Sequence, residues 1–327
     1  MYNNKTFKLK YLSLLLIVLL AGCSTNAEQS GVTIDDKIKI GIMLSDVGLG
    51  DQSFSDAAFF GLERARDELG IIFDYRELEE TGDYAVGLRE LAQADNDLVI
   101  GLGFLVKEDI ETIAAEFPDV NFLLVDDISD LPNITSLTFK EDEGSYLAGI
   151  VAGMKTSTNT VGFIGGADVP LIHKFEHGFT EGVKAINPEA TVVVEYANDF
   201  GNDELGKEIA NDMIDQEADV LYAAAGFTGV GMIEEAQRQG IYAIGVDSDQ
   251  YFLGEKAVIT SMLKNIDVAI YLTIASFVEE KELTDRHIEM GLTENGVGLA
   301  PIRVTSLSKE EEAQLEQLRM NMIEEKK

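Results

Sequence analysis

The sequence predicts an α/β protein made of two doubly wound parallel-sheet lobes. Its 327 residues leave room for about two domains, and 46% of them are hydrophobic, which is enough to build a core. Short apolar runs rich in β-branched residues alternate with longer amphipathic stretches, and this alternation occurs twice along the chain. Strand and helix signals in this order are typical of βαβ units, in which a helix connects two parallel strands.

The first series of elements occupies residues 38–125. We expect each apolar run to form a buried strand and each amphipathic stretch to form a helix that covers the sheet. The predicted strands are 38–44, 71–75, 98–102 and 122–125, and the predicted helices are 54–69, 84–94 and 107–117.

A second series follows residues 133–140, beginning with a helix at 142–154 and reaching a strand or crossover at 257–262. Between these we expect strands at 161–164, 191–196, 220–225 and 242–246, and helices at 171–186, 203–216 and 229–239. Ser308 and Glu311 form a capping-box pattern that predicts a final helix over 308–327. The second lobe is thus expected to be of the same class as the first.

The first 22 residues have the pattern of a secretory signal peptide. Three lysines precede an apolar run at 12–20 that is too short to span a bilayer, and small residues lead to Cys23. This ending resembles the lipobox of bacterial lipoproteins, so we expect cleavage before Cys23, lipidation of its thiol and attachment to the outer face of the cell membrane. An ordinary signal with an incidental cysteine is the alternative. Residues 23–36 are polar and small and are expected to form a lipidated tether.

The charge and the cysteine count exclude several classes of protein. With 59 acidic and 25 basic side chains the net charge is −34, and we find no basic patch that could bind nucleic acid. A single cysteine cannot form an internal disulfide or a thiolate metal cluster. His173 and His177 are four residues apart on a predicted helix, but without a third ligand nearby we expect no metal site and no cofactor. There is no nucleophile motif for a hydrolase.

Polar side chains follow several of the predicted strands. Asp46, Asp126, Asp127 and Asp247 stand at strand ends, where open α/β sheets bind their ligands. A carboxylate there can hydrogen-bond a ligand or cap the next helix. The segment 226–231 opens a helix after a strand, and we interpret it as a tight turn with a ligand-contacting amide.

Two aromatic residues lie in polar loops, one in each predicted lobe. Phe54 and Phe200 are surrounded by Gly, Asp, Asn and Ser. Such rings can stack on the two faces of a planar ligand, or they can fold back onto their own lobe.

Together, these and other segments resemble the basic membrane protein family of bacterial lipoproteins, the substrate-binding subunits of nucleoside ABC transporters. The likeness runs from about residue 37 to at least residue 274. The matching segments are 45–48 (SDVG), 51–54 (DQSF), 133–136 (NITS), 143–145 (EGS), 147–149 (LAG), 161–166 (VGFIGG), 170–172 (PLI), 206–208 (GKE), 229–231 (GVG), 245–250 (GVDSDQ) and 260–264 (TSMLK).

The resemblance implies a type I periplasmic-binding-protein fold. The N-terminal lobe would comprise 37–139 plus about 266–298, and the C-terminal lobe 140–265 plus about 299–327. The lobes would close on a purine nucleoside and deliver it to an ABC permease and its ATPase. The alternatives are a nucleoside-sensing lipoprotein without a transport role and a nucleoside-processing enzyme, although we expect no enzymatic activity.

The resemblance also implies roles for particular residues. Phe54 and Phe200 match the two stacking rings, and Asp46 and Asp126 match positions that hydrogen-bond the base. Ser55 stands where many relatives have Asn. The ribose-facing positions are Gly226, Asp247 and Lys264.

Overall fold

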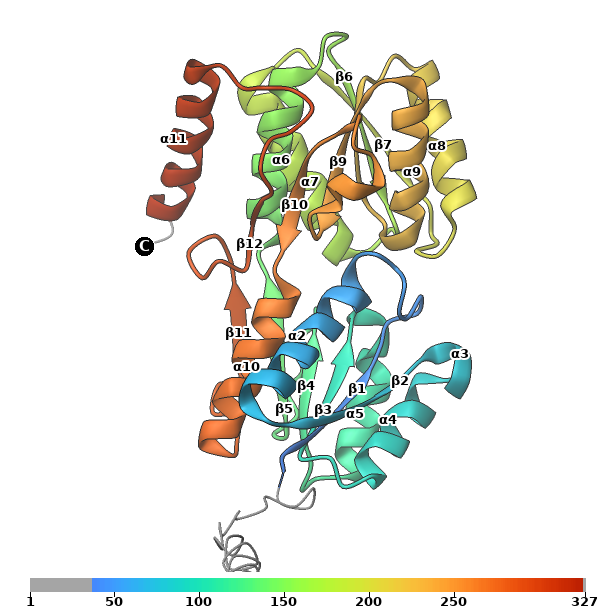
Figure 1. The fold of residues 1–327 in the computed structure, drawn as a ribbon, viewed down its shortest axis with the longest axis vertical. Helices are drawn as coiled ribbons and strands as arrows, with labels where there is room; N and C mark the ends of the chain where they lie inside the picture. Colours follow the sequence, from blue (N-terminus) through green and yellow to red (C-terminus); the bar gives the residue numbers. More distant parts are fainter. Residues whose placement is uncertain (1–36, 326–327) are drawn as a thin grey trace, which may run out of the picture. The chain divides into compact units, whose positions relative to one another are not determined.

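The computed structural model describes residues 37–325, and the chain from Ile38 onward forms one compact unit (Figure 1). The predicted signal peptide at 1–22, the lipidation site Cys23 and the tether at 23–36 lie outside the described residues. Within the described range, no helix is long and apolar enough to cross a membrane.

The first sheet has six parallel strands in the order β11-β5-β4-β3-β1-β2. Its strands are β1 (Lys39–Met43), β2 (Ile72–Arg76), β3 (Leu98–Leu102), β4 (Asn121–Val125), β5 (Ile134–Phe139) and β11 (His287–Met290). The helices that follow or cover them are α2 (Phe54–Leu69), α3 (Leu78–Thr81), α4 (Tyr84–Gln93), η2 (Phe104–Val106), α5 (Lys107–Glu116) and α10 (Ile266–Glu280).

The second sheet has the order β12-β10-β9-β8-β6-β7, and only its edge strand β12 is antiparallel to its neighbour. Its strands are β6 (Thr160–Gly165), β7 (Thr191–Tyr196), β8 (Val220–Ala224), β9 (Tyr242–Asp247), β10 (Val258–Lys264) and β12 (Val297–Leu299). Its helices are α6 (Glu141–Lys155), α7 (Pro170–Ile186), α8 (Asp203–Asp215), α9 (Gly226–Gln239), η3 (Gln250–Leu253) and α11 (Lys309–Glu325).

The central strands are the most apolar because helices cover both faces of each sheet. Every residue of β3 and of β8 is buried. A strand that is buried on both faces reads as a continuous apolar run, which explains why these two strands are recognisable in the sequence. The predicted α/β class with two doubly wound sheets is confirmed.

Most predicted elements are confirmed to within two residues of their observed ends. Residues 257–262 were predicted as a strand or a crossover, and they form the strand β10. The predicted start of the helix at residue 229 is wrong, because α9 begins at Gly226. Gly226 has a φ of 55°, which lets the chain turn from β8 directly into the helix. The capping box is confirmed, with mutual hydrogen bonds between Ser308 and Glu311.

The chain passes between the two sheets at three places. It leaves β5 for α6, returns from β10 through α10 to β11, and crosses again from β11 to β12. Figure 1 shows these segments close together beside β12. The lobe boundaries given above stay a prediction.

Candidate functional site

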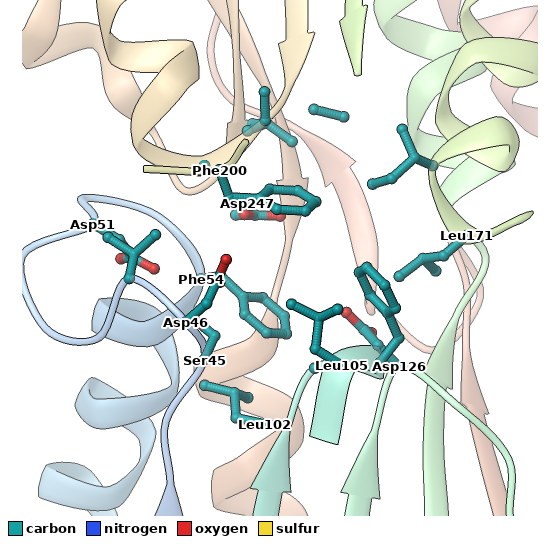
Figure 2. A pocket seen from close by; sticks show the side chains of 18 of the residues that line it. Ser45, Asp46, Asp51, Phe54, Leu102, Leu105, Asp126, Leu171, Phe200 and Asp247 are labelled. Carbon is teal, nitrogen blue, oxygen red and sulfur yellow. The ribbon is translucent and has the colours of Figure 1, made fainter. Parts of the chain in front are cut away.

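A cavity lies where the carboxyl ends of strands from both sheets meet (Figure 2). About 670 Å³ of space within it, including its opening to solvent, is not occupied by atoms. Its wall combines apolar and aromatic side chains with a few carboxylates. The lining residues include Ser45, Asp46, Asp51, Phe54, Tyr84, Leu102, Phe104, Leu105, Asp126, Leu171, Phe175, Phe200, Gly226, Asp247 and Lys264.

Seven of the eight residues predicted to bind the ligand line this cavity. They are Asp46, Phe54, Asp126, Phe200, Gly226, Asp247 and Lys264. Ser55 is not among the lining residues. It is fully buried beneath them, where its hydroxyl lies 2.7 Å from the Ser45 hydroxyl and its amide donates to Asp51 Oδ2 at 2.7 Å. Ser55 thus supports the wall through Ser45 and Asp51.

The two phenylalanines reach the cavity from different sheets. Phe54 is the first residue of α2, and its ring lies against Gly103, where an added Cβ would be 3.3 Å away. The Phe200 ring packs so closely on Gly166 that any side chain there would overlap it. Phe200 also meets the Phe104 ring edge-to-face, with the centroids 6.3 Å apart. Phe200 therefore both packs on its own lobe and lines the cavity.

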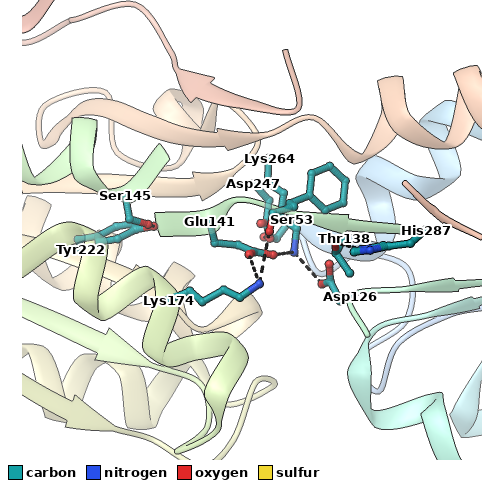
Figure 3. A network of polar contacts seen from close by, with 11 residues as sticks. Ser53, Asp126, Thr138, Glu141, Ser145, Lys174, Tyr222, Asp247, Lys264 and His287 are labelled. Carbon is teal, nitrogen blue, oxygen red and sulfur yellow. Dashed lines mark hydrogen bonds and ion pairs between the residues drawn. The ribbon is translucent and has the colours of Figure 1, made fainter. Parts of the chain in front are cut away.

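One part of the wall is a buried charge cluster around Lys264 (Figure 3). The Lys264 Nζ donates to Asp126 Oδ2 at 2.7 Å and lies 3.2 Å from Glu141 Oε1. Burial alone would lower the pKa of Lys264, but the neighbouring carboxylates of Asp126, Glu141 and Asp247 outweigh burial and raise that pKa. The ammonium therefore stays charged, and it is a hydrogen-bond donor to anything bound beside it.

Asp247 extends this cluster at the end of β9. Its Oδ2 accepts a hydrogen bond from the Ser53 hydroxyl at 2.5 Å. Burial raises the pKa of Asp247 to about 6, against the opposing effects of Lys264 and Ser53. Asp126 and Asp247 both have left-handed backbones, with φ of 71° and 62°. Such strained positions gather at ligand sites, and here they turn each carboxylate at its strand end toward the cavity.

Asp46 lies in a different part of the wall. Figure 2 shows Asp46 and Asp126 on either side of the Phe54 ring. Burial raises the pKa of Asp46. Two buried oxygens in this wall, the Tyr84 hydroxyl and Asp126 Oδ1, have no hydrogen-bond partner. Because buried polar groups are normally paired, they are available to a ligand or to water. Because Asp126 is hydrogen-bonded to Lys264, it belongs to the charge cluster, and Asp46 lies on the other side of the Phe54 ring.

The other residues that were singled out in the sequence do not line the cavity. Asp127 accepts a hydrogen bond from Lys107 at 3.0 Å. His173 Nε2 lies 2.7 Å from Asp168 Oδ1, and both His173 and His177 are exposed. Within residues 37–325, no group of three or more His, Cys, Asp or Glu side chains could hold a metal ion.

Comparison with known proteins shows which family the chain belongs to. A family model named Bmp, and described as ABC transporter substrate-binding protein PnrA-like, matches residues 37–327. The chain belongs to this family. It is therefore an ABC transporter substrate-binding protein of the Bmp family, a family of substrate-binding proteins and not of enzymes.

Two relatives and one solved structure illustrate the likeness. The chain is 32% identical to the ABC transporter nucleoside-binding protein BmpA of Lactococcus lactis, over 77% of this chain and 76% of that protein. It is 33% identical to an uncharacterized lipoprotein of Pyrococcus abyssi, over 89% of this chain and 75% of that protein. A crystal structure of an ABC transporter solute-binding protein from Aeropyrum pernix has a TM-score of 0.81 at 26% identity, covering 88% of this chain and 92% of that chain. The fold is that of the type I periplasmic-binding proteins.

Several residues of this Bmp-family site were not predicted from the sequence. Phe104 lies two residues after the end of β3. The rule that ligands bind at the carboxyl ends of strands, which pointed to Asp46 and Asp126, therefore also applies to Phe104. Tyr84 and Phe175 lie at or near the start of helices, where their aromatic side chains gave no separate signal. Glu141 is one of three acidic residues in the first turn of α6, and the sequence does not distinguish it from Asp142 and Glu143.

Proposed function

We propose that this protein captures a purine nucleoside in the cavity and delivers it to an ABC permease. The observation that carries the proposal is the division of one cavity wall into two kinds of surface. Phe54 and Phe200 offer ring faces, and the Lys264, Asp126 and Asp247 cluster offers a charged donor beside charged acceptors. A nucleoside has the matching parts, since its base is a planar π system and its ribose carries vicinal hydroxyls that donate and accept hydrogen bonds.

The charge of the wall supports a neutral ligand. Asp46, Asp51, Asp126 and Asp247 line the cavity, and Lys264 is the one lysine or arginine among its lining residues. A nucleoside adds no charge to this site. A nucleotide would place its phosphate among these carboxylates, so we expect it to be rejected by like-charge repulsion. The name of the Lactococcus lactis relative, a nucleoside-binding protein, agrees with this ligand class.

The contacts between the sheets support capture by closure. Ser53 donates to Asp247, and the Gln250 side-chain amide donates to the Gln52 carbonyl at 3.0 Å. These bonds join the loop before α2 to the segment after β9, and Lys264 joins β10 to the end of β4. We propose that the lobes, 37–139 plus about 266–298 and 140–265 plus about 299–327, separate to admit the ligand and close over it.

Calorimetric titration of the purified protein tests the ligand. We expect inosine, guanosine or adenosine to bind, and the free base, ribose and the nucleoside monophosphate to bind much more weakly. Ligand that binds only the folded protein also raises its melting temperature, which gives a second readout. Equal binding of monophosphate and nucleoside would contradict the proposal. Conversion of the nucleoside to base and sugar during the titration would instead indicate an enzyme.

We propose further that a lipid on Cys23 holds the protein on the extracytoplasmic face of the cell membrane. The signal-like segment 1–22 and the small residues before Cys23 support this, as does a relative that is named a lipoprotein. Cys23→Ala should move the protein from the membrane fraction to the soluble exported fraction without changing nucleoside affinity. Retention of the Cys23→Ala protein in a detergent-soluble membrane fraction would contradict lipid anchoring.

A further inference from the structure

Glu141 is a buried carboxylate that lies just behind the cavity wall. It has no exposed surface, and it is the first residue of α6, directly after the chain crosses from β5. It is not among the residues that line the cavity. A carboxylate that is removed from water in this way is costly unless charged or hydrogen-bonded groups compensate it.

Two lysines hold Glu141 from opposite sides (Figure 3). Its Oε2 accepts a hydrogen bond from Lys174 Nζ at 3.3 Å, and its Oε1 lies 3.2 Å from Lys264 Nζ. Lys174 is half exposed, whereas Lys264 is 2% exposed and reaches the cavity. Glu141 therefore connects the surface of α7 to the cation of the binding site.

The contacts of Lys264 leave one of its protons free. An ammonium group has three N–H donors. Asp126 Oδ2 accepts from one at 2.7 Å, and Glu141 Oε1 forms an ion pair with Nζ at 3.2 Å without a hydrogen bond. These two carboxylates come from the end of β4 and the start of α6, so they fix the ammonium from two directions. The third N–H is left for a group inside the cavity.

We propose that Glu141 is a positioning residue that holds the Lys264 ammonium so that its free N–H meets a ribose hydroxyl of the bound nucleoside. This inference rests on the proposed function, because it takes the ribose to lie beside Lys264. A buried ion pair is not needed for stability, since apolar residues of similar volume often serve as well or better. Positioning the Lys264 ammonium requires a charge at residue 141, whereas filling the space there does not.

The consequence of losing Glu141 is specific. Asp247 also attracts the Lys264 ammonium. Without the Glu141 charge, the ammonium moves toward Asp247, and these two groups then pair with each other and not with the ligand hydroxyls. The base, which stacks on Phe54 and Phe200, keeps its contacts. The loss of affinity is therefore confined to ligands that carry ribose hydroxyls.

The experiment compares inosine with 2′,3′-dideoxyinosine, which lacks both hydroxyls, by calorimetry on the unchanged protein and on Glu141→Gln. We expect Glu141→Gln to weaken inosine binding roughly 10- to 100-fold, the effect of losing a hydrogen bond to a charged group. Binding of the dideoxy analogue should change less than about twofold. The ratio of the two affinities therefore falls, which a general loss of structure would not cause.

Glu143→Gln is the matched control. Glu143 is buried in the same first turn of α6, but its Oε2 accepts from the Leu292 amide at 2.8 Å and its Oε1 lies 3.8 Å from Lys140 Nζ. It should leave the inosine-to-dideoxyinosine ratio unchanged. If Glu141→Gln does not fold, Glu141→Asp keeps the charge and withdraws it by one methylene, and the ratio should fall by a smaller factor.

The outcomes separate this inference from the proposed function. Failure of the unchanged protein to bind any nucleoside overturns the proposed function and this inference with it. Nucleoside binding with an unaltered affinity ratio in Glu141→Gln, or in Glu141→Asp where that variant replaces it, overturns the positioning role alone. An equal loss in Glu143→Gln also overturns it, because the effect would then come from any charge in that turn.

Discussion

Lys264 is the residue at which charge, aromatic packing and the cavity come together. Its Nζ lies 5.2, 5.0 and 5.7 Å from the ring centroids of Phe54, Phe139 and Phe175. Its carboxylate partners are buried with it. In such a poorly solvated environment hydrogen bonds are stronger than in water, and an unpaired polar group is more costly. A ligand hydroxyl that meets Lys264 is therefore bound tightly, and a ligand without one is disfavoured.

The first residue-scale prediction concerns the two rings. Replacing an aromatic that stacks on a base with alanine costs about 1–3 kcal/mol. A loss of affinity of roughly 10- to 100-fold lies within that range. We expect Phe54→Ala and Phe200→Ala each to weaken nucleoside binding by a factor in this range, measured by calorimetry. Because Phe200 also packs on Gly166, Phe200→Ala should in addition lower the melting temperature.

Phe60→Ala is the control for this pair. Phe60 lies on α2, as Phe54 does, but it is 62% exposed and does not line the cavity. It should leave nucleoside affinity unchanged. If Phe54→Ala folds normally and binds as tightly as Phe60→Ala does, the Phe54 ring is a packing residue and does not stack on the ligand.

The second residue-scale prediction is a pH dependence. Burial raises the pKa of Asp247 to about 6, so the carboxylate is ionised above that pH and protonated below it. The ionised form accepts hydrogen bonds from ribose hydroxyls with both oxygens. Affinity should therefore be constant above about pH 7 and fall as the pH decreases through 6. At about pH 5 only roughly a tenth of the groups would be ionised, which limits the loss to about tenfold.

The matched measurement uses 2′,3′-dideoxyinosine over the same pH range. Because this ligand offers Asp247 no hydroxyl, its affinity should be nearly independent of pH in this window. Asp247→Asn should bind inosine weakly at every pH and remove the dependence. An equal pH dependence for both ligands would place the titrating group elsewhere, for example at Asp46, whose pKa burial also raises.

At the scale of elements, glycines allow pairs of helices to pack backbone against backbone. A Cβ at Gly149 of α6 would overlap the carbonyl oxygen of Phe179 in α7, and one at Gly182 of α7 would overlap that of Tyr146 in α6. The same holds between α8 and α9, where Gly206 faces Thr228 and Gly231 faces Asp203. These close contacts fix the helices that follow the strands, and thus the loops that carry the site.

Gly149→Ala tests this packing. Alanine is favoured over glycine inside a helix by about 1 kcal/mol, so propensity alone predicts stabilisation. The overlap with Phe179 acts against it, and overpacking of this kind costs typically about 1–3 kcal/mol. We expect a net loss of stability in denaturant unfolding. Gly229→Ala in α9 is the control. A Cβ added at Gly229 would lie 3.2 Å from the Ala223 methyl and would meet no backbone carbonyl. Equal or higher stability of Gly149→Ala would contradict the close packing.

Most of the long elements were predictable because their own sequence determines them. The apolar run of β3 and the spacing of buried residues in α2 identify both within a residue. The strands β5, β11 and β12 and the helix α10 were not predicted as elements. β11 has four residues and β12 three, and each is defined by pairing with a distant strand. α10 carries apolar residues around most of its circumference, so it lacks a clear amphipathic pattern.

The site was predictable only in part, for a similar reason. Asp46, Asp126 and Asp247 follow from the rule that ligands bind at strand ends, and Phe54 and Phe200 follow from their place in polar loops. Lys264 came from the family resemblance. The pairing of Lys264 with Glu141 and with Asp126 depends on how the two sheets meet. No local pattern encodes a contact between segments so far apart in the chain.

At the scale of the whole molecule, the most distinctive property is its acidity. The 25 basic side chains balance 25 of the 59 acidic charges, which leaves a net charge of −34. Residues 1–22 contain three lysines and no acidic residue, so the acidity lies in the rest of the chain. Ligand capture does not require this charge, because long-range steering has little effect on a neutral ligand. The net charge should instead act on the stability of the fold.

The last prediction is that salt stabilises this protein. Like charges repel in the compact state, and roughly 1 M salt shortens the Debye length to about 3 Å, which screens that repulsion. Salt also weakens exposed ion pairs such as Arg64–Glu68 and Arg89–Glu116, but exposed pairs of this kind contribute little to stability. With so large an excess of negative charge, relief of repulsion should dominate. The melting temperature should therefore be clearly higher in roughly 1 M NaCl than in dilute buffer. Nucleoside affinity should barely change, since the ligand is neutral. A melting temperature that falls or stays constant with salt would show that the acidic groups are too far apart to repel.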